Sequence, residues 1–210
     1  MRPFVFATLI CLSIPSIVAQ NSIRQVDFKN FTYPLKDHLL GHGELQWLSA
    51  QVAGIPRLRT IQLKDGENLQ KVPIGKIDDG GYYEVSGFTL QEVKYADLTG
   101  DGKEDAIVVL RYYTGGTQTT NYVYIYSFAD GHPKLLAYCH TGSRADFGLY
   151  GVYGEHGGLV FELLDPEKSE GDCCSSGFVR TRYRWDGSRF EAVGAPEYGS
   201  AEIETRPLTR

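Results

Sequence analysis

Most of the chain after residue 19 alternates apolar and polar residues over short runs, with glycine-rich turns between them. An alternation of period two places successive side chains on opposite faces of a half-buried β-strand. No long stretch keeps the apolar period of 3.6 residues that an amphipathic helix requires. The pattern predicts an all-β fold of mainly antiparallel hairpins, arranged as a sandwich or an open barrel-like sheet, with at most one or two short helices.

Asp-Gly pairs mark several of the predicted hairpins, because this pair tolerates the positive φ angles that a tight turn requires. A Gly-Gly pair between two apolar runs gives the same signal. Four hairpin turns are predicted, at Asp65-Gly66, Asp130-Gly131, Gly157-Gly158 and Asp186-Gly187.

The two ends of the β-rich region are less regular. Residues 23–33 predict an early strand, and the glycines and prolines within 34–56 limit that stretch to one short helix. The tail 194–210 mixes proline, glycine and charge, which predicts a flexible end. No repeat of fixed period is present, which argues against a propeller or a solenoid.

The first 19 residues contain one basic residue, a continuous apolar stretch and a small residue at the end, which is typical of a secretory signal peptide. Cleavage is predicted after Ala19. Cys11 follows Ile10 rather than the small residue that precedes a lipidated cysteine, so we expect a soluble exported protein, either secreted or periplasmic. The predicted organisation is a signal peptide over 1–19, one β-rich domain over 20–193 and a tail.

The net charge of −5 argues against a nucleic-acid partner, because phosphate binding depends on clustered Lys and Arg. Arg180, Arg182 and Arg184 alternate along one predicted strand, a pattern typical of a solvated face. No segment after the signal peptide approaches the ~20 apolar residues of a membrane span, so we expect no transmembrane anchor in the mature chain. The sequence is compatible with either a protein or a glycan as the partner.

Three cysteines remain after signal-peptide removal, so at least one thiol is free or forms an intermolecular bond. The internal bridges open to them are Cys139 to Cys173, Cys139 to Cys174, and Cys173 to Cys174. The adjacent pair lacks the two-residue spacing of a zinc ligand pair and has no nearby pair of histidines. Zinc is therefore a weak interpretation.

The stretch "YADLTGDGKEDAIVVL" has the clearest chemical signal in the chain. Calcium prefers six to eight oxygen ligands, and calcium loops supply them from alternating positions around a glycine at the sixth place. Here the matching positions are Asp97, the Thr99 hydroxyl, Asp101, the Lys103 carbonyl and Asp105. The spacing predicts a candidate calcium site, and calcium is the one cofactor that the sequence suggests.

An EF-hand is excluded, because its twelfth place requires a bidentate glutamate and here holds Val108. The strand-loop-strand arrangement resembles the calcium loops of integrin-type FG-GAP repeats. Those loops usually hold Asp or Asn where this chain holds Thr99, so the expected calcium affinity is low. The alternative is a hairpin in which Asp97 and Asp101 accept hydrogen bonds from turn amides.

Six features of the chain are informative when they are taken together. They are the signal peptide, the "DLTGDG" strand pair, the "YTGGT" loop, the "GSRADFGL" segment, the Cys-Cys loop and the final "RWDGSRF" hairpin. With these features, residues 80–193 resemble a family of uncharacterised exported bacterial β-proteins. The resemblance implies a β fold and a secreted or envelope location. It implies no reaction and no ligand.

Two other groups of residues are ligand-binding candidates. Arg144 stands two residues from Asp146, so the pair either presents a guanidinium to an anionic ligand or locks its own loop. Tyr122, Tyr124 and Tyr126 share one face of a predicted strand, where they either stack on sugar rings or pack in the core. Core packing and the loop lock are the favoured interpretations.

No Gly-x-Ser-x-Gly or His-Glu-x-x-His motif is present in the sequence. We therefore expect a non-enzymatic exported β domain that acts as a binding or envelope-associated module. The first alternative is a glycan- or peptide-processing hydrolase that uses Asp97, Asp101 or Asp146 with Arg144, which requires these side chains to converge in one cleft. The second alternative is an inhibitor of a secreted enzyme.

Overall fold

The computed structural model describes residues 22–36, 48–49, 58–74, 82–169, 171 and 174–201. These residues form three antiparallel sheets of two, four and six strands, which confirms the all-β prediction. The helical elements in this part of the chain are three short 3-10 turns, η1 (Ile23–Gln25), η2 (Phe28–Asn30) and η3 (Pro166–Lys168). No helix among the described residues is long and apolar enough to cross a membrane.

The described strands are numbered in chain order. Their bounds are β1 (Thr32–Lys36), β2 (Leu48–Ser49), β3 (Leu58–Gln62), β4 (Glu67–Ile74), β5 (Tyr82–Ala96), β6 (Asp105–Thr114), β7 (Thr119–Ala129), β8 (His132–Ser143), β9 (Leu149–Glu155), β10 (Gly158–Leu164), β11 (Gly177–Trp185) and β12 (Phe190–Ser200). The six-stranded sheet has the order β2-β8-β7-β6-β5-β4, and the four-stranded sheet has the order β12-β11-β10-β9. Strands β1 and β3 pair with each other.

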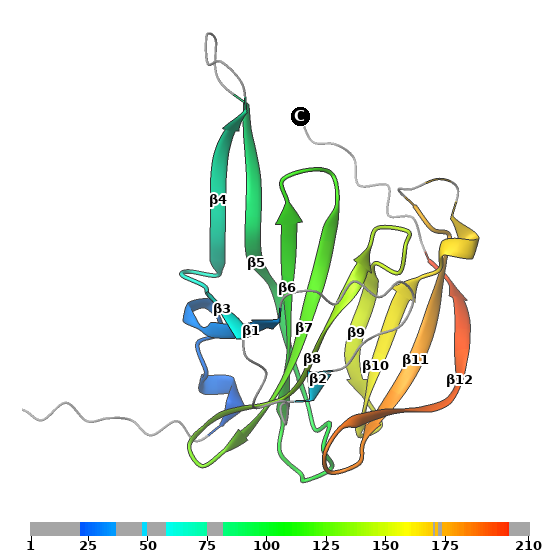
Figure 1. The fold of residues 1–210 in the computed structure, drawn as a ribbon. Helices are drawn as coiled ribbons and strands as arrows, with labels where there is room; N and C mark the ends of the chain where they lie inside the picture. Colours follow the sequence, from blue (N-terminus) through cyan, green and yellow to red (C-terminus); the bar gives the residue numbers. More distant parts are fainter. Residues whose placement is uncertain are drawn as a thin grey trace, which may run out of the picture.

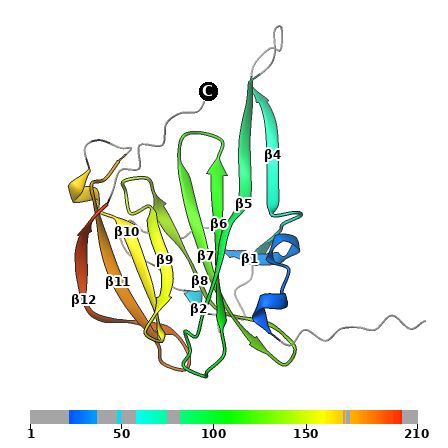
Figure 2. The ribbon, with the colours of Figure 1, turned by 180° about the vertical axis from the view of Figure 1, so that it is seen from behind.

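The six-stranded sheet is the middle of three layers (Figures 1 and 2). Its strands β6 and β7 contain runs in which every residue is buried, whichever face it points to. A strand that is apolar on both faces needs a layer on each side. The four-stranded sheet covers one face, and an N-terminal layer of η1, η2, β1 and β3 covers the other.

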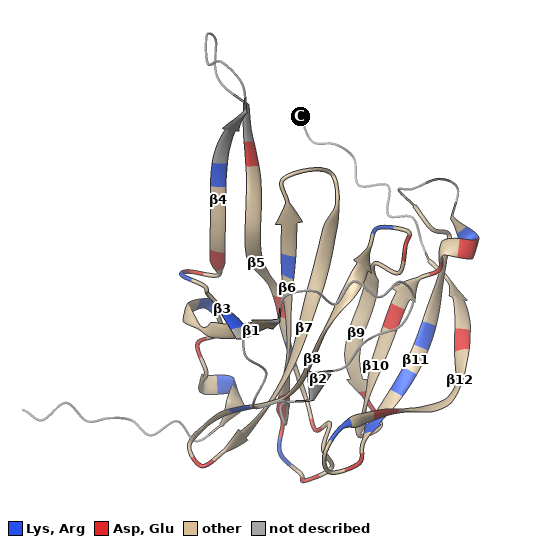
Figure 3. Ribbon diagram, viewed as in Figure 1, with Lys and Arg blue, Asp and Glu red and all other residues tan. Residues whose placement is uncertain are grey.

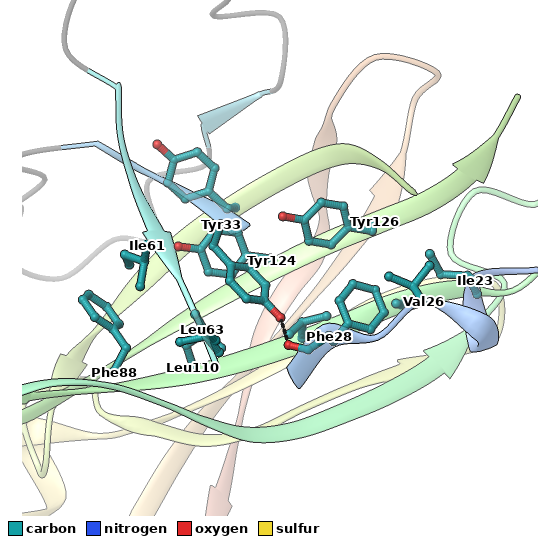
Figure 4. Close-up of a cluster of buried hydrophobic side chains, with 13 residues drawn as sticks. Ile23, Val26, Phe28, Tyr33, Ile61, Leu63, Phe88, Leu110, Tyr124 and Tyr126 are labelled. Atoms are coloured by element: carbon teal, nitrogen blue, oxygen red, sulfur yellow. Dashed lines mark hydrogen bonds between the residues drawn. The ribbon is translucent and has the colours of Figure 1, made fainter. Parts of the chain in front are cut away.

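The N-terminal layer packs on tyrosines of the central sheet (Figure 4). Tyr124 and Tyr126 are almost completely buried beneath Phe28 and Tyr33, with ring centroids 5.0 Å apart for Tyr33 and Tyr124. The hydroxyl of Tyr33 donates to the Phe28 carbonyl at 2.6 Å, and that of Tyr124 donates to the Pro34 carbonyl at 2.9 Å. Each of these two hydroxyls is thus satisfied inside the core.

The opposite face of the central sheet is aliphatic. Ile107, Val109 and Val123 lie against Leu159 and Phe161 of the four-stranded sheet, and all five are fully or almost fully buried. The two faces of the central sheet therefore use different side chains, tyrosines against the N-terminal layer and branched aliphatic residues between the sheets.

Three of the four predicted turns join paired strands. Asp130 and Gly131 have φ angles of 53° and 82° in the β7–β8 turn, as the Asp-Gly pattern predicts. The β11–β12 connection contains Asp186-Gly187. The β9–β10 turn is centred one residue earlier than predicted, because His156 and Gly157 hold the positive φ angles.

The fourth predicted hairpin is wrong, although its turn is correct. Asp65 and Gly66 adopt positive φ angles, but β3 pairs with β1 whereas β4 pairs with β5. The turn is fixed from outside, because the Lys29 carbonyl accepts from the Gly66 amide and the Gly66 carbonyl accepts from the Leu90 amide. Asp65-Gly66 therefore passes the chain from one layer to the next.

Both ends of the domain differ from the prediction. Residues 23–30 form two 3-10 turns instead of a strand, because the side chain of Asp27 accepts hydrogen bonds from the Lys29 and Asn30 amides. The tail predicted to be flexible from residue 194 continues β12 to Ser200, paired with β11. The predicted signal peptide over 1–19, most of the stretch 34–56 and residues 202–210 lie outside the described residues.

Replacing Tyr33 by Phe tests the join between the N-terminal layer and the central sheet. We expect Tyr33→Phe to lower the free energy of unfolding by about 1–2 kcal/mol, because the buried Phe28 carbonyl loses its donor. Urea unfolding of the protein checks this value. The control is Tyr198→Phe, where Tyr198 is 74% exposed and no change is expected. Equal effects of the two changes would contradict the assignment.

Candidate functional site

The loop between β5 and β6 is held by its aspartates. Asp97 accepts from the Gly100 amide at 2.7 Å and from the Gly102 amide at 3.0 Å, and Asp101 accepts from the Lys103 amide at 2.9 Å. Gly100 and Gly102 have φ angles of 76° and 81°, which suit glycine. These are the Asx-type bonds of the hairpin alternative.

Asp105, the first residue of β6, holds the start of the loop. Its side chain is 1% exposed, and one carboxylate oxygen accepts from the Leu98 amide at 2.9 Å and the Thr99 amide at 3.1 Å. The pKa of Asp105 is raised to about 6, mainly by burial and also by the nearby Asp101 carboxylate, against the opposite effect of the two amide donors. Asp105 is thus a buried clamp for the start of the loop.

The loop also anchors the first residues of the domain. Arg24 of η1 forms a two-pronged ion pair with Glu104, at 2.5 and 2.6 Å. The same guanidinium lies 4.5 Å from the ring centroid of Tyr95. The β5–β6 loop is therefore a structural junction with the N-terminal layer.

The candidate calcium ligands of this loop take part in hydrogen bonds of the loop itself. Within the part of the chain that the structure describes, no three His, Cys, Asp or Glu side chains are grouped so that they would hold a metal ion. Asp97, Asp101 and Asp105 each direct a carboxylate oxygen to backbone amides of their own loop. The candidate ligands Thr99 and Lys103 enter this pattern through their backbone amides, each of which donates to an aspartate.

The turn between β8 and β9 presents Arg144 and Asp146 on an exposed loop. Backbone bonds lock this turn, since the Gly142 amide donates to the Phe147 carbonyl and the Gly148 amide donates to the Arg144 carbonyl. A Cβ at Gly148 would overlap that carbonyl, which explains why glycine stands there. These backbone hydrogen bonds hold the turn that carries Arg144 and Asp146.

The hydrolase alternative requires carboxylates from both loops in one cleft. Strands β5 to β8 run up and down in sequence, so the β5–β6 loop and the β8–β9 turn lie at opposite ends of the sheet (Figures 1 and 2). The ends of a ten-residue strand such as β6 are about 30 Å apart. Asp97 and Asp101 therefore do not meet Asp146 and Arg144.

The tyrosine candidates belong to the core rather than to a sugar-binding surface. Tyr124 and Tyr126 are covered by the N-terminal layer, and Tyr122 is half-buried against Phe88 and Tyr112. Burial raises the pKa values of Tyr124 and Tyr126 well above the ordinary value of a phenol. Tyr124 and Tyr126 therefore present no ring face to solvent, in keeping with core packing, the interpretation favoured from the sequence.

Cys139 is a free thiol buried between the two large sheets, and burial raises its pKa. Cys174 is disulfide-bonded, and its partner lies outside the described residues together with Cys173. The two predicted bridges to Cys139 are therefore absent from the structure. Cys139 takes part in neither bridge because it faces the inter-sheet core from the middle of β8.

The exposed face of the four-stranded sheet, here called the outer face, groups aromatic and charged side chains. Tyr150 of β9 is 41% exposed and stacks on Phe178 of β11, with ring centroids 4.9 Å apart. The Arg180 guanidinium lies 5.4 Å from the Phe178 ring centroid. Val193 and Arg184 extend the exposed surface along the neighbouring strands.

A buried carboxylate organises the outer face. One oxygen of Glu162 accepts from the Tyr153 hydroxyl at 3.0 Å and from Arg180 at 2.6 and 2.8 Å. Burial and the bond to Glu162 raise the pKa of Tyr153. A Cβ at Gly151 would lie 2.7 Å from the other Glu162 oxygen, so glycine leaves room for the carboxylate on the sheet. Arg182 forms ion pairs with Glu155 and Glu197.

The sequence reasoning missed this outer face. The arginines of β11 were predicted to form a solvated face, but Arg180 and Arg182 are half-buried and paired. The one available signal was Glu162 in the run "GLVFELL", because a carboxylate in an apolar strand requires a buried partner. Tyr150 gave no signal, since its stacking depends on which strands become neighbours.

Comparisons of this chain with protein-family models, with curated proteins and with solved structures find no match.

The aspartate pattern predicts different costs for two alanine changes in the β5–β6 loop. Asp97→Ala removes two amide acceptors and Asp101→Ala removes one, so we expect losses of about 2 and about 1 kcal/mol in EDTA. Urea unfolding measures both. A rise in melting temperature with millimolar calcium that Asp101→Ala abolishes would contradict the hairpin interpretation and support a metal loop.

Asp105 predicts a pH dependence of stability. Its pKa is raised from 3.8 to about 6 by folding, so the unfolded chain releases this proton first as the pH increases. The stabilisation is complete below pH ~4 and is lost as the pH rises through ~6, by about 2–3 kcal/mol. Asp105→Asn keeps an amide acceptor and should lack this loss. Parallel stability profiles of the wild type and Asp105→Asn in urea would refute the prediction.

Proposed function

We propose that this protein is an exported, non-enzymatic binding module whose outer face binds a neutral glycan. The observation that carries the proposal is the exposed Tyr150 ring, which is held on Phe178 beside the paired Arg180 and Glu162. The ring face supplies an apolar platform, and the charged groups at its edge supply hydrogen-bonding atoms.

A planar aromatic ring suits the apolar face of a sugar ring, because both surfaces are flat and poorly hydrated. Tyr150 presents part of its ring to solvent, while Phe178, which is 9% exposed, stacks against one face of that ring. A rigid platform of this kind binds without ordering a loop, which lowers the entropic cost of association.

The charges of the outer face favour a neutral ligand. Arg180 and Arg182 are already paired with Glu155, Glu162 and Glu197, so neither sign dominates (Figure 3). Paired arginines and carboxylates still offer donors and acceptors to hydroxyl groups, as a sugar requires. A strongly charged ligand would have to compete with these internal ion pairs.

Two further observations support a module that binds and does not catalyse. The acidic loops that the hydrolase alternative needs are at opposite ends of the central sheet, and the carboxylates of the β5–β6 loop bond to its own backbone. Export is supported by the apolar segment over residues 1–19. Among the described residues, Ile23 is the first that is buried. Cleavage after Ala19 would leave the described domain whole.

Binding to a microarray of neutral oligosaccharides of glucose, galactose, mannose and N-acetylglucosamine tests the proposal. We expect saturable binding to at least one oligosaccharide, reduced about tenfold by Tyr150→Ala, because loss of one stacked ring costs about 1.4 kcal/mol. The matched control is Tyr198→Ala, which removes a more exposed tyrosine on the opposite side of the same sheet. Absence of binding, or equal losses in both variants, would refute the proposal.

A further inference from the structure

The face of the central sheet that packs on the four-stranded sheet changes from apolar to polar along its strands. Val109, Val123 and Cys139 face the inter-sheet core. Side chains two positions apart on a strand point to the same side of the sheet. Arg111 of β6, Asn121 of β7 and Thr141 of β8 are each two positions from one of these three residues, so they point to the same side.

Strand register places these residues side by side. Arg111 pairs with Thr89 of β5 and with Asn121 of β7, and the Asn121 amide donates to the Thr141 hydroxyl at 3.3 Å. Directly cross-strand neighbours have Cβ atoms about 5 Å apart. Thr89, Arg111, Asn121 and Thr141 therefore form one row across four strands, here called the polar row.

Arg111 has no partner in the polar row. Within the described residues its side chain forms no ion pair and no hydrogen bond, and its Nε is shielded from solvent. A shielded donor without an acceptor costs free energy, so such a group normally has a bound ion or another ligand. By contrast, Arg180 and Arg182 on the outer face of the four-stranded sheet both have glutamate partners.

No carboxylate of the neighbouring strands is placed to neutralise Arg111. Strands β6, β7 and β8 contain a single acidic residue, Asp105, at the far end of β6 (Figure 3). On β5, Glu92 forms an ion pair with Lys94 at 3.0 Å. Glu84 lies four residues before Phe88 and shares its face of the sheet, which is opposite to the face of Arg111. Within the described residues, the carboxylates of β5 to β8 thus form no ion pair with the Arg111 guanidinium.

The groups around Arg111 can donate further hydrogen bonds. The Thr89 hydroxyl accepts from the Gln91 side-chain amide at 2.7 Å. This hydroxyl therefore keeps its own hydrogen for another acceptor. Asn121 adds a side-chain amide. A planar guanidinium beside a hydroxyl and an amide donor matches the oxygens of a carboxylate or a phosphate.

We propose that the polar row is a binding site for an oxyanion, centred on Arg111 and flanked by Thr89 and Asn121. The site lies on the central sheet, away from the outer face of the four-stranded sheet, so it is independent of the glycan proposal. A molecule that carries a carboxylate or a phosphate would place that group against the guanidinium, and the Thr89 hydroxyl and the Asn121 side-chain amide would complete its hydrogen bonds.

The direct test is nuclear magnetic resonance of the wild-type protein in which the arginine side chains are labelled with ¹⁵N. Titration with inorganic phosphate, and separately with acetate, should shift the Arg111 Nε–H signal and the Asn121 and Thr141 amides with one common saturation curve. The ion that saturates at lower concentration identifies the shape of the bound group. If neither ion gives saturable shifts at concentrations up to about 20 mM, the proposal is overturned.

Three variants separate a site from general charge effects. Arg111→Gln should abolish the saturable shifts of Asn121 and Thr141, and Arg111→Lys should weaken binding at least tenfold because lysine lacks the planar fork. Arg184→Gln is the matched control, since it removes an exposed arginine of the four-stranded sheet and should leave binding unchanged. Equal losses in Arg111→Gln and Arg184→Gln would also overturn the proposal.

Discussion

The burial of β6, β7 and β8 on both faces is the constraint on which the rest of the structure depends. Residues 106–110 of β6 are all buried, so this strand cannot form the surface of a two-layer protein. The four-stranded sheet covers one face of the central sheet, and the N-terminal layer covers the other face. Residues 22–36 are therefore part of the core, and their contacts with Tyr124 and Tyr126 close it.

This arrangement moves the candidate functional surfaces away from the conspicuous motifs. The tyrosines of β7 hold two layers together, and the aspartates of the β5–β6 loop satisfy the amides of their own turn. Two surfaces remain with chemistry that the fold itself does not use. They are the outer face around Tyr150 and the polar row around Arg111, where the inter-sheet face ceases to be apolar.

Local patterns in the sequence predicted local structure well and tertiary structure less well. Alternation gave the all-β class, and Asp-Gly pairs located positive φ angles even at Asp65-Gly66, where the strands separate into different layers. The hydrogen bonds of Asp97 agree with the alternative of a hairpin with Asx turns. The outer face and the isolation of Arg111 depend on strand order and register, which one sequence does not specify.

The accessibility of individual tyrosines tests the three-layer account most directly. Nitration of the folded protein, mapped by mass spectrometry, should modify Tyr150 and Tyr198 first, because they are 41% and 74% exposed. Tyr33, Tyr124 and Tyr126 should stay unmodified until the protein unfolds, since they are buried between layers. Modification of Tyr124 or Tyr126 at the rate of Tyr198 would contradict the account, because the central sheet would then lack its N-terminal cover.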